Sequence, residues 1–310
     1  MSQIAVLIPT RNRPEKIAKL LDSLRSSTIK PNQIIIVASG EDIKNHLKPF
    51  EDSFEISYQY TQVVGQIAQK KIGISLINEE SNWCLFLDDD LTVDCKAIEF
   101  ALEAVNSRHA AGVVGVGFSL PTTSRAKNAN PITLRMGSLF GINTNTPGKV
   151  LRNGHATSYL HLEEIKTTEW LNGASMWRKS VLYTYGLGIP STRYAACEDL
   201  IFSYPLREKG ELLYAPKARL HFQDVELSDY DSLIVFESAS YWRYYFVCQN
   251  GLSRISFFYG QFGRILFIVL RTRNGKLSTF LKFIKSQVPL LKTYFGHKPH
   301  LLLLEELVGK

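Results

Sequence analysis

The sequence predicts an α/β protein with a mostly parallel central sheet, because apolar strands alternate with amphipathic helices along the first 118 residues. Residues 4–8 form a continuous apolar run, which is typical of a strand covered on both faces, and residues 34–38 form another. Pro14, after the first run, suits the first turn of a helix. Apolar side chains then recur at the spacing of one helix face, at Ile17, Leu20, Leu21 and Leu24.

The alternation of helix and strand continues as far as Phe118. A helical pattern over 67–76 leads into a strand over 83–87, and a helix over 98–105 precedes a strand over 112–118. Ligands bind beyond the carboxyl ends of the strands in such sheets. The residues expected to converge there are Thr10, Arg11, Ser39 and the three acids at 88–90.

The pattern is less regular after residue 118. Residues 119–165 are rich in Thr, Asn, Pro and Gly, which favours irregular connections, with an edge hairpin as one alternative. Regular structure returns at 168–176. A helix is expected over 200–209, and Gly210 is placed to end it.

Size and composition are those of an ordinary globular protein of one large or two modest domains, with 310 residues, 45% of them hydrophobic and 21% charged. The N-terminal apolar run lacks a basic segment and stops at Pro9, which is too short for a signal peptide or a membrane span. We therefore expect a cytoplasmic protein. Its four cysteines are far apart and predict reduced, mostly buried thiols, with no zinc site or disulfide framework.

The net charge of +7 is concentrated near the C-terminus. Residues 239–304 contain ten Lys and Arg and no Asp or Glu. The most apolar stretch, 255–270, includes Arg264 and is too short to span a bilayer. This region is typical of helices that lie on an anionic membrane surface, while a packed helical subdomain or a dimer interface remains an alternative. No recognition motif accompanies the charge, so nucleic acid is not an expected partner.

The strand over 83–87 delivers three consecutive carboxylates, Asp88, Asp89 and Asp90. Adjacent acids repel one another, and capping of backbone amides would explain only one of them. A hard cation, Mg²⁺ or Mn²⁺, held by one or two carboxylates and completed by diphosphate oxygens would explain the group.

Four blocks in order make the chain resemble a family 2 glycosyltransferase of the GT-A fold. They are residues 6–13, residues 87–90 in place of the family's DxD motif, residues 170–174, and Glu198-Asp199 followed by Gly210 and His221. The resemblance covers residues 1 to about 225. It implies a GT-A catalytic domain over 1–225, with a nucleotide-sugar-binding half (1–118) and an acceptor and catalytic half (119–225), and a helical C-terminal region over 226–310.

The resemblance also implies roles for individual residues. Asp199 matches the general base that deprotonates the acceptor hydroxyl, so that the sugar is transferred with inversion. Asp88 and Asp90 match the acids of the DxD motif, of which the first tends to contact the nucleotide ribose and the last the metal. His221 matches a histidine that reaches the metal or the diphosphate, and all three are predicted metal ligands. Further matches, together with residues near them, predict nucleotide-sugar contacts at Pro9, Thr10, Arg11, Arg13, Ser39, Lys70, Asp88 and Asp89. Acceptor contacts are predicted at Trp170, Gly173, Ala174 and Glu198.

The sequence also departs from the family pattern. The second strand is not followed by the usual base-binding Asp, so Glu41 or Asp42 would have to substitute, and Lys70-Lys71 stands where Arg-Asn is common. The Q-x-x-R-W signature of processive synthases is absent, which favours transfer of one sugar per encounter.

We therefore expect an inverting, metal-dependent transferase in cell-surface polysaccharide synthesis, located at the cytoplasmic face of the membrane. Its donor would be a UDP-, GDP- or dTDP-linked sugar, and its acceptor a glycan or a lipid-linked glycan. The alternatives are a sugar nucleotidyltransferase, although residues 9–12 contain no glycine, and an inactive module that binds nucleotide sugar or membrane. A homo-oligomer is compatible with the sequence.

Overall fold

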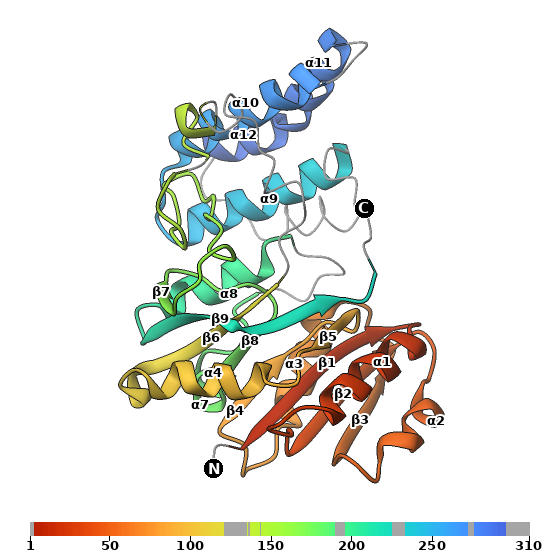
Figure 1. The fold of residues 1–310 in the computed structure, drawn as a ribbon. Coiled ribbons are helices and arrows are strands. Elements are labelled where there is room, and N and C mark those ends of the chain that lie inside the picture. Colours follow the sequence, from red (N-terminus) through yellow and green to blue (C-terminus); the bar gives the residue numbers. More distant parts are fainter. Residues whose placement is uncertain are drawn as a thin grey trace. The chain divides into compact units, whose positions relative to one another are not determined.

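The computed structural model describes residues 3–120, 135, 137–142, 144–189, 196–224, 233–271 and 276–295 (Figure 1). Contacts divide the chain into two compact units, the first made of residues 1–122, 159–194 and 198–225. The second unit takes residues 123–158, 195–197 and 226–310. The last change of unit falls at residue 225, where the boundary was predicted, but 123–158 and 195–197 group with the C-terminal region. The functional halves expected within 1–225 stay predictions.

A mixed β-sheet forms the centre of the first unit. Its strands are β1 (Ile4–Arg11), β2 (Gln33–Ser39), β3 (Ile56–Thr61), β4 (Trp83–Phe86), β5 (Leu91–Val93), β6 (Val113–Ser119), β7 (Lys166–Thr168), β8 (Ser175–Arg178) and β9 (Glu211–Phe222). Their order is β3-β2-β1-β4-β8-β6-β9-β5, and β7 pairs with β9. The α/β fold with a C-terminal group of helices is confirmed.

The expectation of a mostly parallel sheet is confirmed with exceptions, and β6 and β9 also form a parallel pair. Strands β3, β2, β1 and β4 are parallel, but β8 lies antiparallel between β4 and β6. Strands β5 and β7 also run antiparallel to β9. Strand β8 follows a long connection, so its direction depends on how the chain returns to the sheet, which local periodicity does not encode.

Helices cover both faces of this sheet (Figure 1). They are α1 (Pro14–Arg25), α2 (Lys44–Leu47), α3 (Gln66–Ser75), α4 (Ala97–Asn106), α7 (Lys179–Tyr185) and α8 (Glu198–Leu206), with short 3₁₀ turns at Lys48–Phe50 and Ala110–Gly112. The apolar side chains of α1 and α4 pack with alternate residues of β1, such as Val6 and Ile8. Leu7 points to the other face, where it contacts Gly73 of α3 so closely that a larger residue would clash.

Two local expectations need correction. Helix α8 begins at Glu198 and ends at Leu206, three residues before the predicted end at Lys209, with Pro205 in its last turn. A proline removes an amide donor and crowds the preceding turn, which disfavours longer continuation. The four cysteines are free, as predicted, but only Cys84 is buried.

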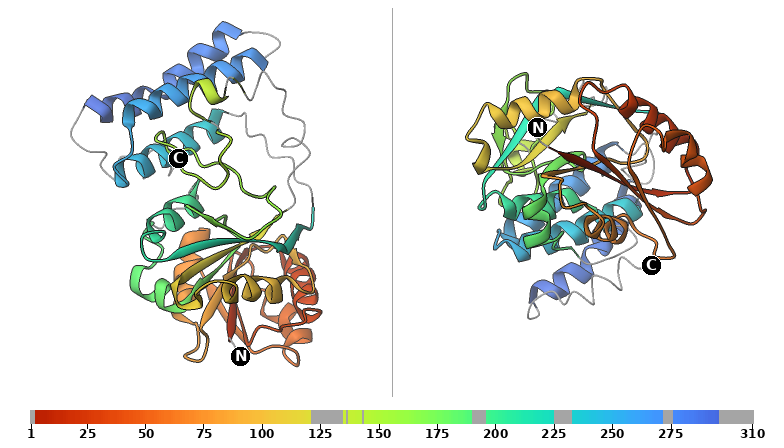
Figure 2. Two further views of the ribbon diagram at one scale, coloured as in Figure 1. Left: turned by 60° about the vertical axis from the view of Figure 1, so that its left-hand side comes forward. Right: turned by 90° about the horizontal axis from the view of Figure 1, so that it is seen from below.

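The second unit is helical where the structure describes it, from Leu233 onward (Figure 2). Its helices are α9 (Leu233–Gln249), α10 (Arg254–Arg271), α11 (Lys276–Ser286) and α12 (Val288–Phe295). Phe236 of α9, Ile265 and Val269 of α10 and Phe283 of α11 form a buried apolar cluster. None of the described helices combines the length and the apolar content that a membrane span requires.

Candidate functional site

The carboxyl ends of β1 and β4 lie side by side because the two strands are parallel neighbours. The segment after β1 therefore meets the acidic triplet after β4, as the sequence predicts. The hydroxyl of Thr10 donates a 2.7 Å hydrogen bond to one carboxylate oxygen of Asp89, and Nη1 of Arg13 donates a 2.9 Å bond to the other. Asp89 is only 6% exposed. Both of its oxygens are thus used within the protein.

Asp89 is therefore a structural link between the segment after β1 and the end of β4, while its contact with a nucleotide sugar stays a prediction. We expect Asp89→Ala to lower the free energy of unfolding by about 2–3 kcal/mol, because the buried Thr10 hydroxyl loses its acceptor and a charged pair is lost. Denaturant unfolding measures this. Asp22→Ala removes an exposed Asp–Arg pair and is the control, with an expected change below about 0.5 kcal/mol. Equal effects of both substitutions would contradict the assigned role.

The other two acids of the triplet lie in different surroundings. Burial raises the pKa of Asp88; Lys70 opposes this rise, while Glu198 and the neighbouring acids add to it. The side-chain amide of Gln66 also donates a hydrogen bond to Asp88. Burial and then Asp89 raise the pKa of Asp90, against the effect of Arg13, whose Nη1 is 3.8 Å away.

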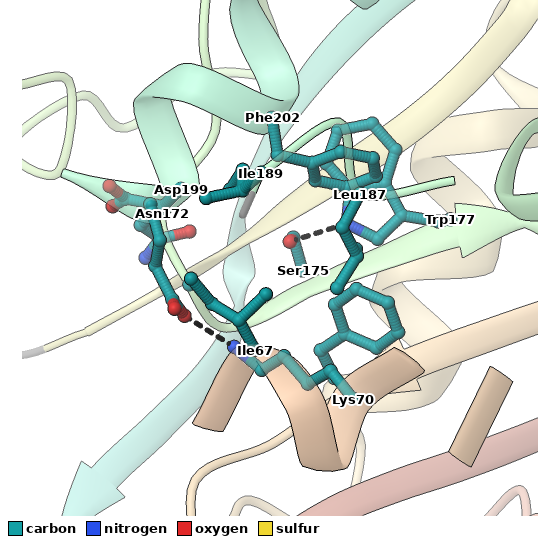
Figure 3. A pocket seen from close by; sticks show the side chains of 12 residues that line it. Ile67, Lys70, Asn172, Ser175, Trp177, Leu187, Ile189, Asp199 and Phe202 are labelled. Carbon is teal, nitrogen blue, oxygen red and sulfur yellow. Dashed lines mark hydrogen bonds and ion pairs between the residues drawn. The ribbon is translucent and has the colours of Figure 1, made fainter. Parts of the chain in front are cut away.

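A pocket on the α3 face of the sheet contains a second group of charges (Figure 3). Lys70 of α3 reaches the first turn of α8, where its Nζ lies 2.7 Å from a carboxylate oxygen of Glu198. The lysine is only 4% exposed. Burial lowers its pKa, but Glu198, Asp88 and Asp199 together raise that pKa above its usual value. Lys70 is therefore charged and surrounded by acids.

Asp199 lines the same pocket, next to Glu198 in the first turn of α8. Burial raises the pKa of Asp199 to about 6, the amide of Leu200 opposes the rise with a 2.8 Å hydrogen bond, and Glu198 adds to it. A carboxylate with a pKa near 6 is ionised at neutral pH and accepts a proton more readily than an ordinary aspartate. The apolar wall of the pocket includes Phe86, Trp177 and Phe202. The arrangement suits a general base in a partly dry site.

The predicted acceptor residues lie in and around this pocket. Gly173 lines it, and no atom lies within 4 Å of the position that a β-carbon would take there. The neighbouring Ala174 is buried in the core. Trp170 does not line the pocket, since its ring packs against that of Tyr159 with 5.1 Å between centroids. The Tyr159 hydroxyl in turn accepts a 2.6 Å hydrogen bond from the amide of Asn172, which holds the 170–174 segment.

Several predicted donor contacts are less accessible than expected. Pro9 and Ser39 are buried within β1 and β2, and among their chain neighbours only Gly40 is exposed. Arg11 is exposed at the end of β1. Nε2 of His221 lies 2.8 Å from Oδ1 of Asp94, so His221 pairs with Asp94 rather than with Asp88 or Asp90. Within the described part of the chain, no group of three or more His, Cys, Asp or Glu side chains could by itself hold a metal ion.

Two glutamines of α3 that contact the candidate site were not predicted from the sequence. Gln66 binds Asp88, and Gln69 donates hydrogen bonds of 2.7 and 2.8 Å to the carbonyls of Thr10 and Val37. Gln69 thereby joins α3 to the carboxyl ends of β1 and β2. Only the helical spacing of 67–76 pointed to this helix, and spacing alone does not single out these two polar residues.

Comparisons with known proteins agree with this architecture. Residues 5–159 match the family model described as Glycosyl transferase family 2. Among proteins with curated descriptions, none matches the chain. Among solved structures, residues 1–349 of TarS from S. aureus are similar, with a TM-score of 0.59 and 12% identity over 94% of this chain and 82% of that one.

Two further structures carry ligands. The same TarS fragment in complex with UDP-GlcNAc has a TM-score of 0.56 at 12% identity, over 94% of this chain and 83% of that one. The mannosyltransferase PcManGT from Pyrobaculum calidifontis, in complex with GDP-Man and Mn²⁺, has a TM-score of 0.54 at 11% identity, over 97% and 77%. At such low identity these similarities establish the fold alone.

Proposed function

Because the chain belongs to glycosyltransferase family 2, we propose that it transfers one sugar from a nucleotide diphosphate sugar to a hydroxyl of a glycan or lipid-linked acceptor. The family match and the similar structures support a glycosyltransferase, which sets aside the nucleotidyltransferase alternative. The observation that carries the proposal is the pocket in which Asp199, with its raised pKa, lies beside the Lys70–Glu198 ion pair.

In this proposal Asp199 is the general base. Its carboxylate accepts the proton of the acceptor hydroxyl while the hydroxyl oxygen forms a bond to the anomeric carbon of the sugar. The bond from that carbon to the diphosphate oxygen breaks, and the nucleoside diphosphate leaves with its electron pair. Attack from the face opposite the leaving group inverts the anomeric configuration. Gly173 leaves room for the acceptor beside Asp199, because its α-carbon faces open space.

Asp88 and Asp90 are the residues proposed to hold a divalent cation. Burial first, and then neighbouring acids, raise the pKa of both carboxyls, and a bound cation would stabilise their ionised forms. Two carboxylates suit Mg²⁺ or Mn²⁺, which commonly complete their coordination with water and substrate phosphate. The cation would stabilise the negative charge that develops on the diphosphate. A similar structure, PcManGT, is in complex with Mn²⁺. His221 is not part of this proposed set, since it pairs with Asp94.

Calorimetric titration with UDP, GDP and dTDP, each with and without Mn²⁺, tests the donor half of the proposal. We expect one nucleotide to bind, and its affinity to fall at least about tenfold without the metal or in Asp90→Ala, since the positive charge that a cation held by Asp88 and Asp90 would supply to the diphosphate is then lost. Asp94→Ala is the matched control and is expected to bind as the wild type does. Binding of no nucleotide, with or without metal, would favour the inactive module instead.

A further inference from the structure

Helix α10 of the second unit presents a row of apolar side chains to solvent. Ile255, Tyr259, Phe262 and Leu270 are all exposed, Ile255 by 70%. Their spacing of four, seven and fifteen residues from Ile255 places them on one side of the helix. Phe140 packs against Tyr259 and Phe262 and covers a part of this row.

Helix α11 extends this apolar surface. Its inner side is occupied by Phe283, which is buried against α9 and α10. On another side, Leu277 and Leu281, one helical turn apart, are 71% and 57% exposed. The ring of Phe280 of α11 lies edge-on to Phe262, with 6.4 Å between centroids, so α11 contacts the apolar row of α10. We call Ile255, Tyr259, Phe262, Leu270, Leu277 and Leu281 the apolar face.

Lysines border the leucines of this face. Lys285 continues the row of Leu277 and Leu281 after one further turn, and Lys282 directly follows Leu281. Both lysines are exposed, as are Lys276 at the start of α11 and Lys292 of α12. Their long side chains can reach past the leucines to anionic groups at the same level.

The second unit as a whole carries a large positive charge. Residues 123–158, 195–197 and 226–310 contain sixteen Lys and Arg but only six Asp and Glu, which gives a net charge of +10. The rest of the chain has a net charge of −3, since the total is +7. The apolar face thus belongs to a strongly cationic unit.

We propose that the apolar face of α10 and α11 docks onto the surface of an anionic lipid bilayer. The leucines would enter the interface and the lysines would pair with lipid phosphates, while the helices lie on the membrane. A second copy of this chain is a poorer partner, because pairing would bring two units of charge +10 together. A nucleic acid would match the charge but would leave the six apolar side chains uncovered.

Co-sedimentation of the full chain with vesicles tests this proposal. The vesicles contain phosphatidylcholine alone or phosphatidylcholine mixed with phosphatidylglycerol, and neither sugar nucleotide nor metal is added. We expect binding to the anionic vesicles, weakened by salt. The double variant Leu277→Ser/Leu281→Ser removes apolar area from the interface, and Lys282→Ala/Lys285→Ala removes two positive charges near the lipid phosphates. Each should lower the partition coefficient at least about tenfold.

Matched controls alter exposed residues of the first unit, with Lys44→Ala/Lys48→Ala for charge and Val63→Ser for apolar surface. These variants should bind vesicles as the wild type does. Equal binding to neutral vesicles, or unchanged binding of both double variants, would overturn the proposal. Absence of vesicle binding together with a dimer that Leu277→Ser/Leu281→Ser dissolves would instead assign the face to a second copy. Nucleotide binding is measured separately, so failure here leaves the proposed sugar transfer intact.

Discussion

Asp199→Asn is expected to lower the rate of sugar transfer by about 10³-fold while nucleotide binding changes little. The amide cannot accept the acceptor proton, yet it keeps the shape of the side chain and its hydrogen bond to the amide of Leu200. Release of nucleoside diphosphate in the presence of donor and acceptor measures transfer, and calorimetry measures binding. Asp52→Asn, an exposed site away from the pocket, is the control. Near-normal transfer by Asp199→Asn would exclude Asp199 as the base.

The same substitution should not weaken the fold. The folded-state pKa of Asp199, about 6, is above its unfolded value of 3.8. A carboxyl with a raised pKa makes folding less favourable as pH rises from the unfolded to the folded pKa, and this cost persists at higher pH. Asp199→Asn removes it and should raise the free energy of unfolding at pH 7 by as much as about 3 kcal/mol. A lower stability at pH 7 would show that the lost activity reflects misfolding rather than chemistry.

Lys70→Met is expected to damage both activity and stability, because it leaves Glu198, Asp88 and Asp199 without the cation that they surround. Lys70 lowers the pKa of Asp199, so its removal should shift the acidic limb of the pH–rate profile upward from about 6 by about 1 pH unit. Loss of one partner of a buried ion pair should also cost about 3 kcal/mol of stability at neutral pH.

The loss of stability in Lys70→Met should depend on pH. Without the lysine, the folded-state pKa values of Asp88 and Asp199 rise further above their unfolded values, so stability falls as pH rises. The difference from wild type should therefore be larger at pH 8 than at pH 5. Lys70→Arg keeps the charge and should recover part of the activity, while Lys30→Met changes an exposed lysine and serves as the control. An unshifted pH profile for Lys70→Met would show that Lys70 does not influence the protonation of Asp199.

Much of the first unit follows from short stretches of sequence. The apolar runs at 4–8 and 34–38 became β1 and β2, and the helical spacing from Ile17 to Leu24 became the buried side of α1. Pro14 is at the start of that helix, as predicted. The position of the acidic triplet after a buried strand was also predicted, because a strand end depends on the residues next to it.

The arrangement of the candidate site depended on contacts between distant residues. Thr10 and Arg13 were predicted to contact the nucleotide, yet both bind Asp89, more than seventy positions away. Lys70 pairs with Glu198, which is 128 positions further along the chain. No local pattern selects such partners, since they are set by which strands become neighbours and which face each helix covers.

The sequence by itself therefore determined the type and order of the early strands and helices, the family blocks and the acid-free charge of residues 239–304. Only the tertiary structure decided that β8 lies antiparallel between β4 and β6, that Asp89 is an internal link, and that Leu277 and Leu281 face solvent. The physical reason is the distance along the chain between the residues that determine each feature. Periodicity and strand ends reflect neighbours within a few positions, whereas pairing, burial and pKa depend on groups that the fold brings together.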